Sequence, residues 1–101
     1  MNNRYEIARK FANTIRSEDI VKIILFGSVA RGDDTEESDI DILIIRANSD
    51  ELSDEINSAA VDIILQEDEF ISPHVMSEEH FNKSRNYPFL TNVLKEGVVL
   101  E

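Results

Sequence analysis

The apolar and polar positions of this chain follow two periods, that of a helix and that of a strand. Across residues 3–17 apolar side chains recur at intervals of three and four, which predicts an amphipathic helix. Residues 20–26 form an almost continuous apolar run, which predicts a strand buried on both faces. Residues 39–45 alternate acidic and aliphatic side chains before becoming wholly aliphatic, which predicts a second strand. The helix is expected to pack against a sheet that contains both strands.

The pattern changes after residue 45. A polar link at residues 46–49 leads to apolar residues at helical spacing, and the predicted helix carries Leu52, Ile56, Ala59 and Ala60. Residues 61–65 have the sequence Val-Asp-Ile-Ile-Leu and are predicted to form a third strand directly after that helix. Residues 67–76 are predicted to be a loop. The middle of the chain therefore predicts one more helix and one more strand.

The last quarter of the chain carries start and stop signals of helices. Ser77 is a suitable N-cap for a short turn, because the two residues after it are acidic and favour a helix N-terminus. Pro88 suits the first turn of a last helix, and Gly97 suits its end. Residues 98–100 predict a brief final strand. We find no repeats or linkers, so residues 1–101 are expected to form a single domain.

Length, charge and composition limit the class of protein. The chain has 101 residues, no cysteine and a formal net charge of −11 at pH 7. Its polar start and short apolar runs resemble neither a signal region nor a membrane span, so we expect a cytoplasmic protein. Its ten Lys and Arg residues are scattered among 21 Asp and Glu residues, so a nucleic-acid partner is disfavoured. Zinc is not expected at His74 and His80, because the chain lacks cysteine and a third histidine.

A turn with the features of an anion site follows the first predicted strand. Gly27 permits a close backbone approach to a ligand, and Ser28 is expected to cap a short helical turn that Gly32 ends. Backbone N–H groups and a hydroxyl then converge where an anion such as phosphate is favoured. A Gly-Ser pair after a strand is also a common turn without a ligand, so this turn alone does not decide the function.

Asp39 and Asp41 share one face of the second predicted strand, because side chains alternate along a strand. Ile40, Ile42 and Ile44 take the opposite face. Two like charges at the start of a core strand repel each other, and Mg²⁺ or Mn²⁺ converts that repulsion into coordination. Acidic alternation also occurs on the solvated face of an edge strand. The aliphatic continuation of this strand and the preceding Gly-Ser turn favour a metal site.

The spacing of these residues resembles a known motif. Gly27-Ser28, ten residues and then Asp39-x-Asp41, with Ala30-Arg31-Gly32 between them, is similar to the minimal nucleotidyltransferases of the DNA polymerase β superfamily. The resemblance covers about residues 20–66 and implies an α+β fold, with a small mixed β-sheet and flanking helices. It also implies a third acidic residue on a later strand, flanked by apolar residues. Asp62, within the run 61–65, has that form.

This resemblance implies a metal-dependent transfer of AMP from ATP. The expected ligands of two divalent ions, Mg²⁺ or Mn²⁺, are Asp39, Asp41 and Asp62. The expected nucleotide-binding residues are Gly27, Ser28 and Arg31. Asp62 is expected beside the attacking hydroxyl, where it can also accept a proton. Arg31 has an alternative role, because it can pair instead with the acidic loop of residues 33–37.

The acceptor is expected to bring its own surface, because a small single domain offers none for it. Resemblance to the stand-alone minimal nucleotidyltransferases implies an antitoxin that acts on a HEPN-domain toxin, in some systems by transferring AMP to a tyrosine of the toxin. Sheet edges and the apolar helix faces around Phe11 and Phe89 are the expected docking surfaces. The alternative is a binding module that neutralises the toxin by contact. A site without activity tends to lose its carboxylates, and this chain retains Asp39, Asp41, Asp62 and Gly27-Ser28, which favours activity.

Overall fold

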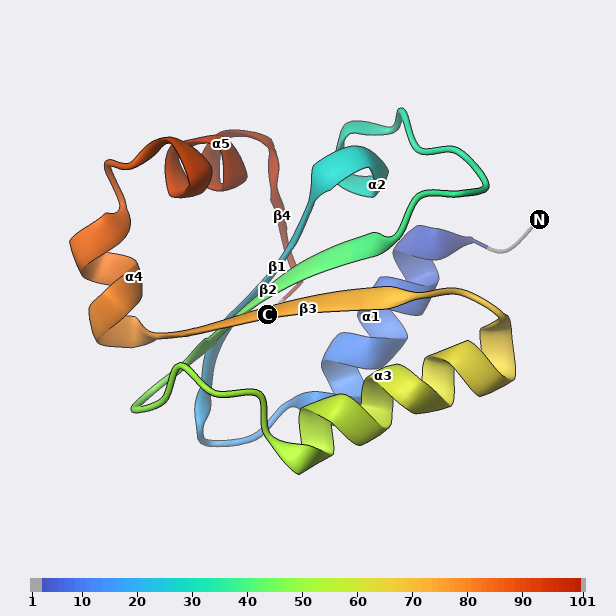
Figure 1. Cartoon of the computed structure of the whole chain (residues 1–101), viewed down its shortest axis with the longest axis horizontal. Coiled ribbons are helices and arrows are strands. Elements are labelled where there is room, and N and C mark those ends of the chain that lie inside the picture. The colour runs from blue at the N-terminus through green and yellow to red at the C-terminus, as the bar shows by residue number, and fades with distance from the viewer. Residues whose placement is uncertain (1–2, 101) are drawn as a thin grey trace.

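The computed structural model describes residues 3–100, which form four strands and five helices (Figure 1). In chain order the elements are α1 (Arg4–Ile15), β1 (Ile20–Phe26), α2 (Gly27–Arg31), β2 (Ile40–Arg46), α3 (Asp54–Glu67), β3 (Ile71–Ser77), α4 (Glu78–Ser84), α5 (Pro88–Glu96) and β4 (Val98–Val99). The strands form one sheet in the order β3-β2-β1-β4. β1 is antiparallel to β2 and β4, whereas β3 is parallel to β2. The expected α+β fold with a small mixed sheet is confirmed.

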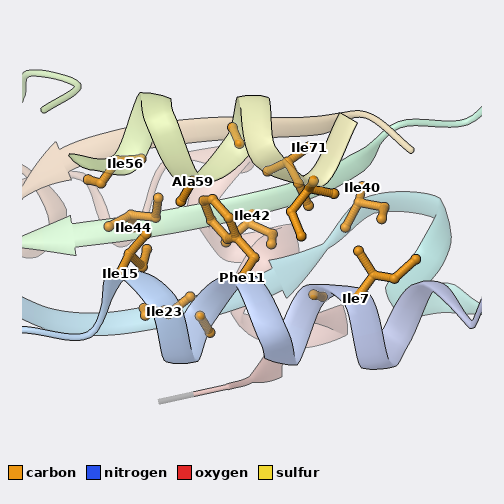
Figure 2. Packing of buried hydrophobic residues seen from close by; sticks show 14 of the residues in the cluster. Ile7, Phe11, Ile15, Ile23, Ile40, Ile42, Ile44, Ile56, Ala59 and Ile71 are labelled. Atoms are coloured by element: carbon orange, nitrogen blue, oxygen red, sulfur yellow. The ribbon is translucent and has the colours of Figure 1, made fainter. Parts of the chain in front are cut away.

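The sheet separates two groups of buried side chains. On one face the strands pack against α1 and α3, which lie side by side, and Figure 2 shows the side chains that meet there, among them Phe11, Ile15, Ile42, Ile44 and Ile56. On the other face a smaller cluster joins the strands to α4 and α5, through Ile24, Leu43, Ile45, Phe81, Leu90 and Val93. Neighbouring residues of β2 therefore enter different clusters, as the alternation in its sequence predicts.

Side-chain caps define where several helices begin. The side chains of Asn3 and Ser53 accept hydrogen bonds from the third backbone N–H of α1 and α3, and Ser77 does the same for α4. Asp50 reinforces the start of α4, because its Oδ1 accepts a hydrogen bond from the Ser77 N–H at 2.8 Å and lies 3.0 Å from Nδ1 of His80. The hydrogen bond from the Ser77 N–H is the main cause that lowers the pKa of the Asp50 carboxyl, and the contact with His80 lowers it further. The predicted cap at Ser77 is confirmed.

Residues 61–65 are not a strand, so that prediction is wrong. They continue α3, whose buried residues are Ile56, Ala59, Ala60 and Ile63. These positions repeat at helical spacing across the supposed boundary, and they place Val61 and Asp62 on the exposed side of the helix. The apolar run looked like a strand because a short aliphatic segment does not by itself distinguish a strand from a buried helical turn.

β3 covers Ile71–Ser77, so the prediction of a loop over residues 67–76 is wrong from Ile71 onward. The strand lies at the edge of the sheet and pairs only with β2, which explains how it accommodates Pro73, a residue without a backbone N–H. Most of its residues are only partly buried. Its strand structure depends on the neighbouring backbone of β2 more than on an apolar pattern of its own. No helix formed by residues 3–100 combines the length and apolar composition needed to cross a membrane.

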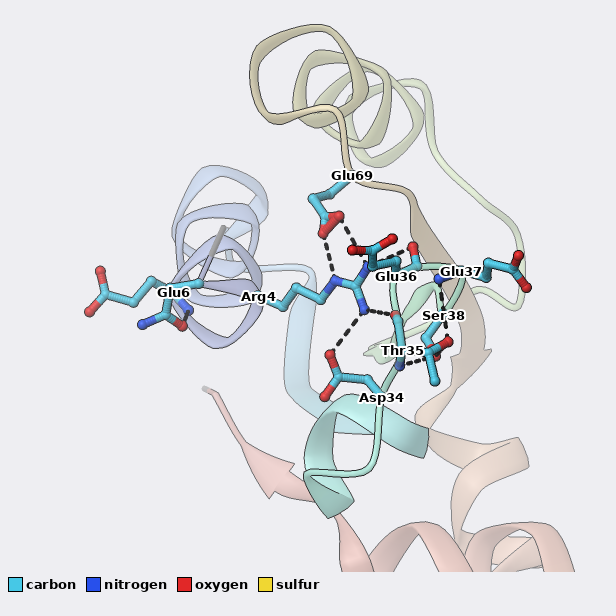
Figure 3. Close-up of polar contacts among 9 residues, drawn as sticks. Arg4, Glu6, Asp34, Thr35, Glu36, Glu37, Ser38 and Glu69 are labelled. Carbon is cyan, nitrogen blue, oxygen red and sulfur yellow. Dashed lines mark hydrogen bonds and ion pairs between the residues drawn. The ribbon is translucent and has the colours of Figure 1, made fainter. Parts of the chain in front are cut away.

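The acidic loop after α2 is held by Arg4 (Figure 3). The Arg4 guanidinium donates to both carboxylate oxygens of Glu69, at 2.6 and 3.2 Å, and to Asp34 at 2.9 Å. It also donates to the backbone carbonyls of Thr35 and Glu36. Only 11% of the Arg4 side chain is exposed, and its hydrogen bond with Glu69 is the main cause that raises its pKa. Arg4 thus ties α1 to the segment that leads into Asp39.

We expect Arg4→Lys to destabilise the protein by about 1–2 kcal/mol, because lysine keeps the charge but loses the planar set of donors that reaches four groups. Arg9→Lys, on the exposed side of the same helix, should change the free energy of unfolding by less than about 0.5 kcal/mol. Urea denaturation of both variants measures the difference. Equal stabilities would show that the Arg4 contacts contribute only as ordinary surface pairs.

Candidate active site

An open cleft of about 380 Å³ lies where the adjoining ends of β1 and β2 meet α2 and α5. Its lining residues are Phe26, Gly27, Ser28, Arg31, Asp41, Phe89, Asn92, Val93 and Glu96. Four of the predicted site residues are therefore brought together in one cleft. Asp39 lies one residue before β2 and is exposed, two positions from Asp41. Of the predicted pair of carboxylates, Asp41 therefore lines the cleft and Asp39 lies just before the strand, outside the cleft lining.

Gly27 makes the closest backbone approach in this site. Its φ angle is +76°, in the left-handed region that side chains disfavour, and it turns the chain from β1 into α2. A Cβ atom built on Gly27 would collide with Oδ2 of Asp41. Glycine is therefore required here for two reasons. The backbone has a positive φ angle, and the Asp41 carboxylate occupies the space of a side chain. The pairing of β1 with β2 also brings Gly27 close to Asp41, because Phe26, the residue before Gly27, is in register with Asp41.

The turn after β1 forms a short helix that begins two residues earlier than predicted. α2 starts at Gly27 and its N-cap is Phe26, so the prediction that Ser28 is the N-cap is wrong. Phe26 has no polar side chain to accept from the first N–H groups of the helix, and the Ser28 hydroxyl lies at the cleft. Gly32, with a φ of +80°, ends the helix as expected.

The two carboxylate oxygens of Asp41 face different neighbours, one at the end of β1 and the other on β3. Oδ2 faces the backbone of Gly27, whereas Oδ1 lies 3.6 Å from Nε2 of His74. About 30% of the Asp41 side chain is exposed, so this carboxylate is accessible to a ligand. Ile40, on the other face of the strand, is fully buried under α1 and α3. The predicted division of β2 into a carboxylate face and an aliphatic face is confirmed.

His74 is the residue that the sequence analysis missed. It lies on β3, on the same face as Asp41, because Ser72 is in register with Asp41 and His74 with Leu43. Its ring packs edge-on against Phe26, with 5.1 Å between ring centroids. Once residues 67–76 were assigned to a loop, no pattern connected His74 to the carboxylates. The only signal was the alternation of Ile71 and Val75 with polar residues, which is weak.

Asp62 is the predicted site residue that the structure does not bring to the cleft. It lies on the exposed side of α3, and α3 packs on the face of the sheet opposite to Asp41. The strand that was to carry Asp62 beside the other carboxylates does not exist. Among residues 3–100 we find no group of three or more His, Cys, Asp or Glu side chains that could hold one metal ion. The structural basis for Asp62 as a third metal ligand is therefore lost.

Arg31 forms ion pairs at the rim of the cleft. Its guanidinium lies 3.3 Å from Asp33 and 3.5 Å from Glu96, and the hydrogen bond with Asp33 is the main cause that raises its pKa. Pairing with the acidic loop, the alternative from the sequence analysis, is thus observed. Both side chains of the Arg31–Glu96 pair are more than 40% exposed, so the pair is weak and can open.

A comparison with protein families agrees with this geometry. The model described as "Nucleotidyltransferase domain" matches residues 8–98. The chain belongs to the nucleotidyltransferase domain family. A relative in this family, from Methanocaldococcus jannaschii, carries the name "Putative protein adenylyltransferase". It is 46% identical over 101 residues, which cover 97% of this chain and 98% of the relative.

Two solved structures share the nucleotidyltransferase fold of this chain. One is a toxin–antitoxin with AMP-PNP, with a TM-score of 0.61 at 21% identity, covering 99% of this chain and 73% of that one. The other is the tri-AMPylated Shewanella oneidensis HEPN toxin in complex with MNT antitoxin, with a TM-score of 0.61 at 19% identity, covering 98% and 72%. At these identities the likeness establishes the fold alone. It agrees with the mixed sheet and the helices on both of its faces.

The side chains at the cleft have the chemistry of a magnesium–nucleotide site. Mg²⁺ is commonly bound by one or two carboxylates, with phosphate oxygens and water as the remaining ligands. Asp41 supplies a carboxylate beside the turn at Gly27, whose backbone N–H groups favour an anion, and the exposed Asp39 lies two positions before it. The residues present therefore fit a divalent ion that reaches the protein together with a nucleotide.

Substitution of Gly27 should disrupt the site, whereas the same substitution at Gly32 should not. Both glycines have a positive φ, but a Cβ atom on Gly32 would meet nothing within 4 Å. We expect Gly32→Ala to cost about 1 kcal/mol of stability and to keep nucleotide binding. Gly27→Ala should cost about 2 kcal/mol more and should abolish binding, because Asp41 is displaced. Calorimetric titration with ATP and Mg²⁺ tests this, and equal behaviour of the two variants would contradict it.

Proposed function

We propose that this protein is a metal-dependent nucleotidyltransferase that transfers AMP from ATP to a hydroxyl of a partner protein. The observation that carries the proposal is the packing of the Asp41 carboxylate against the backbone of Gly27. This packing joins the Asp41 carboxylate to the Gly27-Ser28 turn within one cleft, and Asp39 lies two positions before Asp41 in the chain. Membership in the nucleotidyltransferase family supports the reaction class.

Each part of the cleft has a role in this reaction. The backbone at Gly27 and the hydroxyl of Ser28 bind the β- and γ-phosphates. Asp39 and Asp41 hold divalent ions, two in the arrangement that the family resemblance implies, with phosphate oxygens as further ligands. When bound, such ions neutralise the charge of the pyrophosphate leaving group and polarise the attacking oxygen. The protein's own contribution is to align the α-phosphorus with the acceptor for an in-line displacement.

The acceptor that we propose is a HEPN-domain toxin, with this protein as its cytoplasmic antitoxin. The relative from Methanocaldococcus jannaschii is named as a protein adenylyltransferase, and one structure of the same fold contains an AMPylated HEPN toxin with its MNT antitoxin. The net charge of −11 and the scattered basic residues make a protein a better partner than RNA. Phe89, with 46% of its surface exposed beside the cleft, remains a candidate contact. Phe11 does not, because it is fully buried.

A second candidate function is neutralisation of the partner by contact alone. It requires neither carboxylates nor a glycine at position 27. The close packing of Asp41 against Gly27, which leaves no room for a side chain, is unnecessary for a docking surface, so it favours the catalytic function.

The Asp39→Asn, Asp41→Asn double variant tests metal-dependent binding and transfer. We expect ATP binding to require Mg²⁺, to be lost with EDTA and to fall at least about tenfold in the double variant, because the charges that hold the ion are removed. Labelled AMP should appear on the HEPN-domain partner protein, but not on bulk tRNA. Asp62→Asn serves as the control, since Asp62 lies across the sheet, and should bind and transfer normally.

Three outcomes would contradict the proposal in different ways. Equally tight Mg²⁺-dependent binding by the double variant would remove the carboxylates from the site. Labelled tRNA without labelled protein would replace the protein acceptor with RNA. Full neutralisation of the partner by the double variant would favour the contact mechanism.

Glu96 offers a test of the role of Arg31. Glu96 pairs with Arg31 and adds a negative charge to a cleft that should bind phosphates. We expect Glu96→Gln to tighten ATP binding about two- to fivefold at low salt, with a smaller gain at high salt. Glu18→Gln makes the same charge change at the opposite end of β1 and should have little effect. If Glu96→Gln weakens binding, the ion pair supports the cleft and Arg31 does not act on phosphate.

A further inference from the structure

The row of side chains across the sheet at Asp41 divides the site into two sides. Phe26 on β1 and Ser72 on β3 are both in register with Asp41. The cleft lies on the β1 side, and none of the residues that line it comes from β3. His74 lies on the β3 side, with Nε2 at 3.6 Å from Asp41 Oδ1 and 3.4 Å from the Ser72 hydroxyl. The carboxylate of Asp41 thus faces the phosphate turn with one oxygen and His74 with the other.

The His74 ring is both held in place and accessible. Phe26 packs edge-on against it at 5.1 Å, and Phe89 lies at 6.3 Å, measured between ring centroids. These contacts restrict the ring from one side, yet 42% of the His74 side chain remains exposed. A buried histidine would be explained by packing alone. This one presents a polar ring edge beside Asp41 to a molecule that arrives from solvent.

In-line transfer fixes the side from which the acceptor must come. If the Gly27-Ser28 turn holds the pyrophosphate on the β1 side of Asp41, the attacking oxygen has to approach from the opposite side, over β3. We propose that this side is the acceptor subsite, and that Nε2 of His74 hydrogen-bonds the acceptor hydroxyl and holds it in line with the α-phosphorus. The inference rests on the proposed function. It gives His74 the position beside the attacking hydroxyl that was predicted for Asp62.

The reaction at this subsite balances without a further reactant. The acceptor oxygen forms a bond to the α-phosphorus of ATP. The bond from that phosphorus to the bridging oxygen breaks, and its electron pair leaves with pyrophosphate. The hydroxyl proton passes to water. His74 is neither consumed nor modified; it contacts the acceptor and fixes its direction of attack.

Two substitutions of His74 separate hydrogen bonding from packing. His74→Phe keeps an aromatic ring against Phe26 but cannot hydrogen-bond, whereas His74→Gln keeps a hydrogen-bonding group and loses the ring. For His74→Phe we expect ATP affinity within about twofold of wild type, measured by calorimetry with Mg²⁺. We expect transfer of labelled AMP to the HEPN-domain partner protein to fall about 100-fold in kcat, because the acceptor is no longer aligned. His74→Gln should recover part of that loss.

His80 provides the matched control, since it is the other histidine of the chain. It is exposed on α4 and contacts Asp50, away from the cleft. His80→Phe should leave both ATP affinity and transfer unchanged. A measurement on the wild-type protein avoids any folding defect of the variants. The side-chain NMR signals of the two histidines are followed while the partner protein is added in the presence of α,β-methylene-ATP. The His74 signal should shift, and the His80 signal should not.

Each result supports or overturns the inference. Normal transfer by His74→Phe, or a His74 signal that does not change while the partner binds, would overturn it. Loss of ATP binding in His74→Phe, equal to that of Asp41→Asn, would place His74 in the nucleotide site and would also overturn it. A wild-type protein that transfers no AMP to any acceptor would instead disprove the proposed function, and the acceptor subsite with it. Because the wild-type reaction is measured first, the two failures are distinguishable.

Discussion

The contact between the backbone of Gly27 and the carboxylate of Asp41 is the constraint on which the site depends. It requires a residue without a side chain at the end of β1 and a positive φ angle at that residue. It also requires β1 and β2 to pair in the register that places Phe26 opposite Asp41. A change of one residue in that register would turn Asp41 to the other face of the sheet and bury it under α1 and α3. The hydrophobic clusters on the two faces therefore determine the position of the chemistry.

Two-sided packing also explains why residues close in the sequence differ in function. Ile40 and Asp41 are neighbours, yet one belongs to the larger core and the other to the cleft. The side with the larger core, under α1 and α3, gives rigidity and leaves little room for a ligand. The side with α4 and α5 has a smaller core, and α5 closes one wall of the cleft through Phe89 and Glu96. The smaller core and the open cleft therefore lie on the same face of the sheet.

The sequence predicted the parts of the fold whose pattern is local and strong. β1, β2 and α5 were found because their apolar runs, turn glycines and Pro88 act within a few residues. The boundary between α3 and β3 was not found, because residues 61–65 have a strand-like composition but continue α3, where Ile63 is buried at helical spacing and Val61, Asp62 and Leu65 are exposed. β3 contains Pro73 and forms through the unpaired edge of β2, which no local pattern reports. Gly27, Ser28, Arg31 and Asp41 were correctly expected to lie together, whereas Asp62 was misplaced and His74 was overlooked for this same reason.

The Arg4 cluster has a consequence for the order in which the molecule folds. Arg4 reaches Glu69, 65 residues later in the chain, and its contacts with residues 34–36 hold the segment that leads to Asp39. The wall of the cleft comes from α5, which is nearly the last element of the chain. Contacts of such long sequence separation form late, because closing a long loop costs entropy before it gains any contact. Because α5 supplies one wall, the cleft is complete only once α5 has packed against α2 and β1.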